Sequence, residues 1–172
     1  MANDGVIYRD QIMEMFHLNE NMHESALLIM LPLRLGIDSM NPIYYPLLKK
    51  CFDNEYCVGI AGGRPNSSLF FMGYQNDDLL YLDPHFIQQS IRVKDHYTWD
   101  ELQSYHCAEI RVLPLRVTDP SLVIGFLCRS ISDFKDFCMS CKDITHGSTP
   151  LFTIEDHTPD YQQQEVDILG FD

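Results

Sequence analysis

Apolar positions along the chain occur in short runs, and most of these runs have the length and composition of β-strands. A nearly continuous apolar run spans 26–35 and ends at Gly36; it predicts a strand buried on both faces, since a helix would not carry Pro32 in its interior. The runs Leu69–Tyr74 and Leu79–Leu82 are separated by a short polar turn and predict a β-hairpin. Other strands are expected at Cys57–Ala61, which breaks at Gly62-Gly63, at Leu122–Cys128, and at Glu109–Val117, which Pro114 makes an edge strand.

Helical patterns stand between these strands. The dipeptide Asn41-Pro42 is typical of a helix start, and we expect that helix to continue to about Phe52. Thr98 followed by Glu101 is a capping-box signature and predicts a short helix. Two more helices are expected, an early one over 7–16 and a late one capped by Ser132, with apolar positions at Phe134, Phe137, Cys138, Cys141 and Ile144. This mixed order predicts an α+β architecture, or the sheet half of a larger α/β domain.

The charge of the chain divides it into two parts. The chain has 172 residues and a formal net charge of −13, with 12 Lys and Arg against 25 Asp and Glu. Six of these acids and no Lys or Arg lie in 146–172, so we expect an acidic, mostly disordered tail there and a folded unit over 1–145. The shortage of clustered cations argues against a nucleic-acid partner. No apolar run approaches the roughly 20 residues of a bilayer span, which predicts a soluble, non-secreted protein with no transmembrane segment.

The hairpin ends in Asp83-Pro84-His85, the densest chemical feature of the sequence. Pro84 pushes Asp83 toward an extended conformation, so that Asp83 and His85 project from the same side of the chain. A carboxylate beside an imidazole orients the ring and stabilises its protonated form, as a general base requires. By itself, Asp-Pro is also typical of a plain turn at a strand end, and that interpretation stays open.

A polar stretch before the hairpin holds Gly62, Gly63, Arg64, Pro65, Asn66 and Ser67. It is typical of a loop that cradles phosphate or of a mobile flap. It lacks the Lys-Ser/Thr ending of a P-loop and the third glycine of a dinucleotide fingerprint, so nucleotide binding has little support. An ordinary structural loop is the alternative.

Two pairs of residues that contain cysteine are also candidate sites. Cys138 and Cys141 have the spacing of metal or dithiol sites, but both lie on the apolar face of the late helix. Buried core thiols are the favoured interpretation and a redox-sensitive pair is the alternative; a zinc site has little support, so no metal or cofactor is expected. His106-Cys107 places a nucleophile next to a base, although neighbouring side chains on an extended chain face opposite ways.

Several stretches together resemble the C-terminal half of the autophagin family, the papain-like cysteine proteases of autophagy. The resemblance covers about residues 6 to 145, and its spacing is most similar to fungal members. The matching motifs are Leu31-Pro-Leu-Arg34-Leu-Gly36, Asn41-Pro42-Ile-Tyr44, Gly59-Ile-Ala-Gly62-Gly63-Arg64-Pro65-Asn66-Ser67-Ser68, Phe71-Met-Gly73-Tyr74, Leu82-Asp83-Pro84-His85, and Asp119-Pro120-Ser121 followed by Gly125-Phe126.

The resemblance implies a papain-like fold and an activity. Such enzymes cleave a ubiquitin-like autophagy modifier after a C-terminal glycine, to mature its precursor and to release it from phosphatidylethanolamine. The family's catalytic pair falls on Asp83 and His85, and its gating loop falls on Arg64 to Ser68. The resemblance also implies a cytoplasmic protein, with recruitment to the pre-autophagosomal structure and a nuclear location both open, and peripheral action at autophagic membranes.

The family's nucleophilic cysteine lies in a Trp-Gly-Cys-type segment that these 172 residues do not contain. The only tryptophan is Trp99, and neither Cys51 nor Cys57 has that context. We therefore expect a chain that carries the catalytic Asp and His and is inactive alone. The alternative is a truncated module that binds the modifier without cleaving it.

Overall fold

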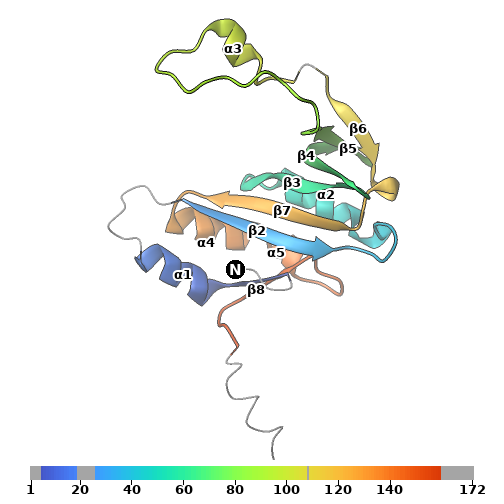
Figure 1. Ribbon diagram of the computed structural model, residues 1–172. Coiled ribbons are helices and arrows are strands. Elements are labelled where there is room, and N and C mark those ends of the chain that lie inside the picture. The colour runs from blue at the N-terminus through green and yellow to red at the C-terminus, as the bar shows by residue number, and fades with distance from the viewer. Residues whose placement is uncertain (1–4, 19–25, 108, 160–172) are drawn as a thin grey trace, which may run out of the picture.

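The computed structural model describes residues 5–18, 26–107 and 109–159, and its centre is a six-stranded sheet (Figure 1). Each neighbouring pair of strands in this sheet is antiparallel. The α+β fold with a mainly antiparallel sheet is therefore confirmed, and the strand that carries Pro114 lies at an edge as predicted. In spatial order the strands are β2 Leu27–Arg34, β7 Ser121–Cys128, β3 Cys57–Arg64, β4 Ser67–Gln75, β5 Asp78–Leu82 and β6 Arg111–Pro114.

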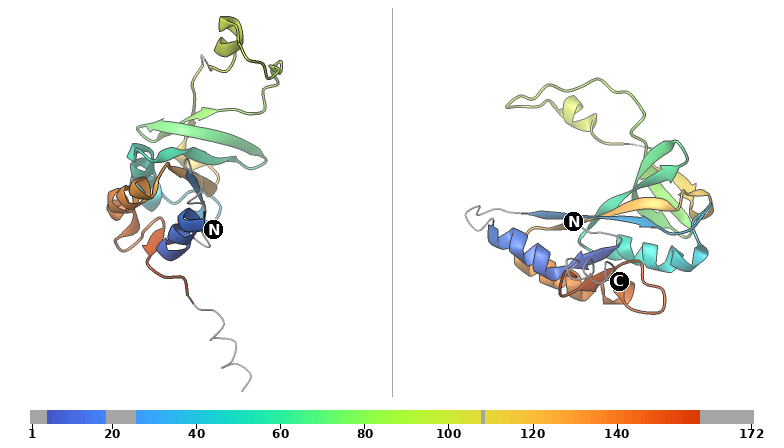
Figure 2. Two further views of the ribbon diagram at one scale, coloured as in Figure 1. Left: turned by 90° about the vertical axis from the view of Figure 1, so that its left-hand side faces the viewer. Right: turned by 60° about the horizontal axis from the view of Figure 1, so that its bottom comes forward.

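Helices cover one face of this sheet, as the right-hand view in Figure 2 shows. The core lies between the two layers, where the rings of Phe126 on β7 and Phe137 have centroids 4.9 Å apart. Most of the fully buried side chains come from the sheet strands and from the helices of this layer. The covering helices are α1 Arg9–Leu18, α2 Tyr45–Asp53, α4 Ile131–Ser140 and α5 Lys142–Thr145.

The helix starts test the capping predictions. Asn41 accepts a hydrogen bond from the backbone N–H of Ile43 and begins a 3₁₀ turn, Pro42–Tyr44, that leads into α2. The capping box of Thr98 and Glu101 is confirmed at the start of α3, Trp99–Gln103. The prediction of Ser132 as the cap of α4 is wrong. Ser130 has the extended backbone of a cap and accepts from the N–H of Asp133, whereas Ser132 lies inside the first turn.

Strand β2 is buried on one face only, so the prediction of burial on both faces is wrong. Ile29 and Leu31 point into the core, whereas 52% of Leu28 and 56% of Met30 are exposed. An unbroken apolar run does not reveal which of its alternating faces another layer covers. The outer face of the sheet is also apolar, and no helical layer covers it within the described residues.

The polar stretch before the hairpin is a tight turn between paired strands. Strand β3 does not break at Gly62-Gly63 but continues through Arg64, and β4 begins at Ser67, so the expected loop reduces to Pro65 and Asn66. Asn66 has a φ of 65°. Gly63, with a φ of 149°, is needed because a Cβ there would strike the carbonyl oxygen of Ser67.

Packed structure also continues past Thr145, where composition suggested the start of a disordered tail. Strand β8, Thr153–Glu155, pairs in parallel with β1, Val6–Tyr8, and Leu151 and Phe152 are buried. Nonlocal pairing with the first strand, which the sequence pattern does not reveal, orders this acidic stretch. Residues 160–172 lie outside the described residues, and the tail prediction there stays a prediction.

Residues 86–110, here called the arm, leave the sheet after β5 and return to it at β6 (Figure 1). The arm carries α3 and projects beyond the outer face of the sheet. The ion pair of Lys94 with Glu101, at 2.7 Å, braces its helix. Within the parts of the chain that the structure describes, no helix has the length and apolar character to cross a bilayer.

Candidate functional site

Asp83 and His85 lie directly after β5 and contact each other. The Nδ1 atom of His85 lies 2.7 Å from Oδ1 of Asp83, and the backbone N–H of His85 donates to the same oxygen at 3.0 Å. The second contact is the hydrogen bond of an Asx turn, for which Pro84 sets the backbone. The two interpretations of this tripeptide are therefore compatible, because the turn itself brings the imidazole to the carboxylate.

The carboxylate is held in its ionised form. The backbone N–H of His85, and next its side chain, lower the pKa of Asp83, while partial burial opposes them. The Asp83 side chain is only 19% exposed, whereas that of His85 is 55% exposed. With Nδ1 directed at the carboxylate, Nε2 is the ring nitrogen left for a reacting group.

A third residue, which the sequence analysis missed, contacts the carboxylate. Nη1 of Arg111 lies 3.9 Å from Oδ2 of Asp83, and the Arg111 guanidinium carbon lies 4.2 Å from the ring centroid of Phe86. Arg111 is the first residue of β6 and is paired with Tyr81 of β5. The only local signal for it was a cation at the start of a strand, which does not identify the strand it pairs with.

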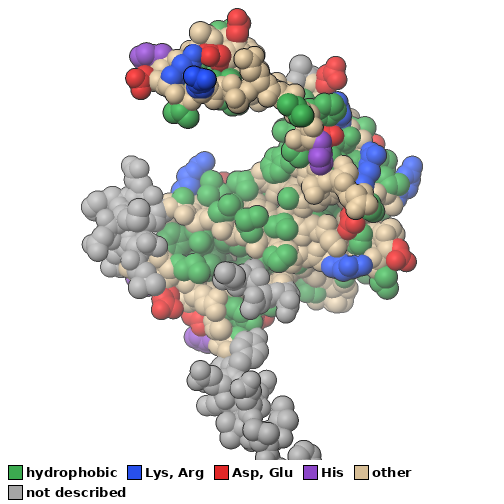
Figure 3. Space-filling model, viewed as in Figure 1, with side chains coloured by type: hydrophobic (Ala, Val, Ile, Leu, Met, Phe, Trp, Pro, Cys, Tyr) green, Lys and Arg blue, Asp and Glu red, His purple; other side chains and the backbone are tan. Residues whose placement is uncertain are grey.

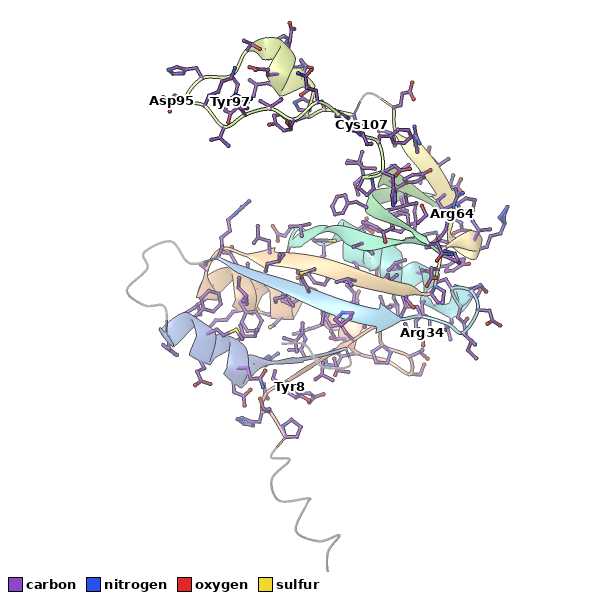
Figure 4. All side chains as sticks on the ribbon, in the orientation of Figure 1. Tyr8, Arg34, Arg64, Asp95, Tyr97 and Cys107 are labelled. Carbon is purple, nitrogen blue, oxygen red and sulfur yellow. The ribbon has the colours of Figure 1, made fainter. Side chains whose placement is uncertain are left out.

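A cavity of about 480 Å³ lies beside the carboxylate, between the strand ends and the arm. It is lined by Asp83, Phe86 and Arg111, and also by His106 and Cys107 of the arm. The Sγ atom of Cys107 lies 3.1 Å from the carbonyl oxygen of Glu109, so its thiol is engaged with backbone. Figure 4 shows Cys107 near the point where the arm returns to the sheet.

The turn at Pro65 and Asn66 lies at the same end of the sheet as the Asp–His pair. Phe70 of β4 is paired with Leu82 of β5, which places Asp83 beside the start of β4. A second cavity, of about 470 Å³, borders this turn and is lined by 61–66 together with residues of β2 and β7. Figure 4 shows Arg64 extending from this end. The fold thus brings the Asp83–His85 pair and the turn at Pro65 and Asn66 to the same end of the sheet.

Cys138 and Cys141 lie in the core beneath the helices. Cys141 is fully buried and Cys138 is 8% exposed. Burial raises the pKa of Cys141 to about 12 and also raises the pKa of Cys138, so both thiols stay protonated. This environment favours core thiols over a redox pair. Among the described residues, no three His, Cys, Asp or Glu side chains converge as a metal ion would require.

An exposed imidazole oriented by an ionised carboxylate, at the end of a strand in a mainly antiparallel sheet, is half of the catalytic arrangement of papain-like cysteine proteases. Residues 1–140 match the family described as the Peptidase C54 catalytic domain. The chain belongs to this family, whose curated relatives are named cysteine protease ATG4, and the resemblance to the autophagins is confirmed.

Three relatives illustrate the match. Cysteine protease ATG4B of Oryza sativa subsp. indica is 40% identical over 150 residues, which are 85% of this chain and 31% of the relative. Cysteine protease ATG4a of Arabidopsis thaliana is 42% identical over 137 residues, 78% of this chain and 29% of the relative. Cysteine protease ATG4C of Homo sapiens is 34% identical over 171 residues, 94% of this chain and 36% of the relative.

The chain spans about a third of the length of these curated relatives. They come from plants and from human, and the expected likeness to fungal members stays a prediction.

Proposed function

We propose that this chain supplies the catalytic histidine and aspartate of a cysteine endopeptidase that cleaves a ubiquitin-like autophagy modifier after its C-terminal glycine. The reaction would mature the modifier's precursor and release the modifier from phosphatidylethanolamine, in the cytoplasm and at autophagic membranes. The observation that carries the proposal is the 2.7 Å contact between His85 and Asp83 in a chain of the Peptidase C54 family.

His85 acts as the general base and then as the general acid. Its Nε2 takes the proton of a cysteine thiol, and the thiolate attacks the carbonyl carbon of the glycine. The imidazolium returns the proton to the leaving amine, and water then hydrolyses the acyl-enzyme with His85 again as base. Asp83 holds Nδ1 throughout and stabilises the imidazolium by its charge.

The nucleophile of this proposal lies outside the 172 residues. Five of the six cysteines are partly or fully buried, and burial raises the pKa of each of them, which is the opposite of thiolate activation. The sixth, Cys107, is exposed, but its thiol faces the backbone carbonyl of Glu109.

The apolar outer face of the sheet is an argument for a partner segment that carries the nucleophile. Large apolar side chains are exposed there, and Figure 3 shows hydrophobic atoms gathered over this face below the arm. An apolar face of this kind marks an interaction surface. We infer that it packs against the remainder of the catalytic domain, which brings a cysteine to the end of β5. The exposed residues include Leu28, Met30, Val58, Phe70, Met72 and Val112.

The turn at Pro65 and Asn66 is the proposed gate over the substrate's C-terminal tail. Arg64, Pro65 and Asn66 are all exposed, and they project from the sheet end that carries Asp83. We infer that this turn moves as the tip of the β3–β4 hairpin. Gly62 and Gly63 of β3 would give the backbone flexibility at the base of the turn.

Cleavage by a joined protein tests the proposal. The chain is fused behind the Cys-bearing part of the rice relative and given a modifier–reporter fusion. We expect cleavage after the glycine, a loss of about 10³-fold or more in His85→Asn, and wild-type rates in His96→Asn, a matched change on the arm. A joined protein that folds and binds the modifier but does not cleave it would contradict the protease proposal and favour the binding module.

A further inference from the structure

Arg111 occupies the position where the strand pair, the arm and the Asp–His pair meet. It begins β6 opposite Tyr81, two residues before Asp83 on the neighbouring strand. It also directly follows the arm, which begins at Phe86 immediately after the Asp–Pro–His turn. Its side chain therefore reaches the carboxylate from the neighbouring strand and not from the turn itself.

The two carboxylate oxygens of Asp83 have different partners. Oδ1 receives both contacts from His85, the ring nitrogen at 2.7 Å and the backbone N–H at 3.0 Å. Oδ2 faces Nη1 of Arg111 at 3.9 Å. A cation near Oδ2 opposes partial rotation of the carboxylate about its Cβ–Cγ bond, and such a rotation would move Oδ1 away from both of its contacts with His85.

The guanidinium is itself fixed in place. It lies over the Phe86 ring at 4.2 Å, close enough for a cation–π interaction, and this contact joins the first residue of the arm to the first residue of β6. The stack also shields one face of the cation from water, although the Arg111 side chain is still 41% exposed. Other titratable groups that line the same cavity are Tyr81, Tyr105, His106, Cys107 and Glu109.

We propose that Arg111 is a positioning residue, which holds Oδ2 of Asp83 so that Oδ1 stays directed at His85 while the imidazole exchanges protons. This role rests on the proposed protease function. It differs from a purely structural role, in which Arg111 would only fasten the arm to the sheet through Phe86. The two roles predict different results when the charge is removed.

The first test uses NMR on the 172-residue chain and does not depend on catalysis. Arg111→Met is expected to raise the pKa of the Asp83 carboxyl and to broaden the Nδ1–H signal of His85 by exchange with water. Arg111→Lys, which keeps the charge, should restore both signals in large part. Arg116→Met removes an equal charge from the turn that follows β6 and should leave the Asp83 pKa and the His85 Nδ1–H signal unchanged. An unaltered Asp83 titration and Nδ1–H signal in Arg111→Met would overturn the proposal.

The second test uses the joined protease. Arg111→Met is expected to lower kcat about three- to tenfold, to leave KM within about twofold, and to move the acid limb of the rate profile to higher pH. Arg111→Lys should recover most of kcat. A lower melting temperature with an unchanged kcat would show a structural role only and overturn the proposal. If the wild-type joined protein itself does not cleave, the proposed function fails, and the NMR result decides the role of Arg111 independently.

Discussion

The two faces of the six-stranded sheet both carry large apolar side chains but have different surroundings. On the inner face, Leu31 and Phe126 are completely buried under the helical layer. On the outer face, Leu28 and Met30 are more than half exposed although they alternate with buried residues along one strand. The inner face thus accounts for the stability of this chain. The apolar side chains of the outer face have no such covering layer among the described residues, and Asp83 and His85 directly follow β5 of the same sheet.

The same Leu→Ala substitution can be made on each face of β2, at Leu31 on the inner face and at Leu28 on the outer face. Leu31→Ala should cost about 2–5 kcal/mol of unfolding free energy, because it leaves a cavity in the packed inner layer. Leu28→Ala should cost less than about 1 kcal/mol, since its side chain is already 52% exposed. Urea unfolding of both variants measures the difference. Equal losses would mean that the outer face is covered in the isolated chain, and the comparison would fail.

Two methionines with matched exposure test whether the outer face is an interface. Met30→Lys on the sheet, 56% exposed, and Met139→Lys on α4, 57% exposed, should each leave the melting temperature nearly unchanged. Only Met30→Lys should weaken binding of the Cys-bearing part, by about tenfold or more, because association would bury the new charge. Calorimetric titration measures the affinity. Equal affinities for the two variants would argue against this face as the interface.

Thiol labelling compares the inner layer with the arm. Cys107 is the exposed cysteine and should react with a thiol reagent within minutes under native conditions. Cys138 and Cys141 should react at least about 100-fold more slowly, since burial keeps both protonated. Mass spectrometry of timed samples assigns the sites. Rapid labelling of Cys138 and Cys141 would instead support a redox-sensitive pair.

A smaller effect is expected from acid on the arm. Lys94, followed by the backbone N–H of Thr98, lowers the pKa of Glu101 to about 2. This carboxylate therefore stabilises α3 fully above its unfolded pKa of roughly 4.3, and the stabilisation is lost as the pH falls toward 2. Amide signals of α3 should weaken over that interval and become insensitive to acid in Glu101→Gln. Acid-insensitive signals in the wild type would mean that other contacts hold the arm.

The sequence pattern correctly predicted turns and a helix cap that depend only on residues close together in the chain. The turn between β4 and β5, the capping box at Thr98 and the Asp–Pro–His turn each depend on neighbours in sequence, and each has the expected structure. The pairing of β1 with β8 and the approach of Arg111 to Asp83 are nonlocal, and no pattern along the chain encodes them. The one-sided burial of β2 was missed for a related reason, because it depends on where the helices pack.

The central claim is that His85, held by Asp83, activates a cysteine from another part of the catalytic domain. The pH dependence of alkylation of that cysteine in the joined protein tests this claim directly and needs no substrate. We predict fast alkylation well below the ordinary thiol pKa of roughly 8.5, and a return to ordinary thiol behaviour in His85→Asn. The same pH profile in both proteins would contradict it.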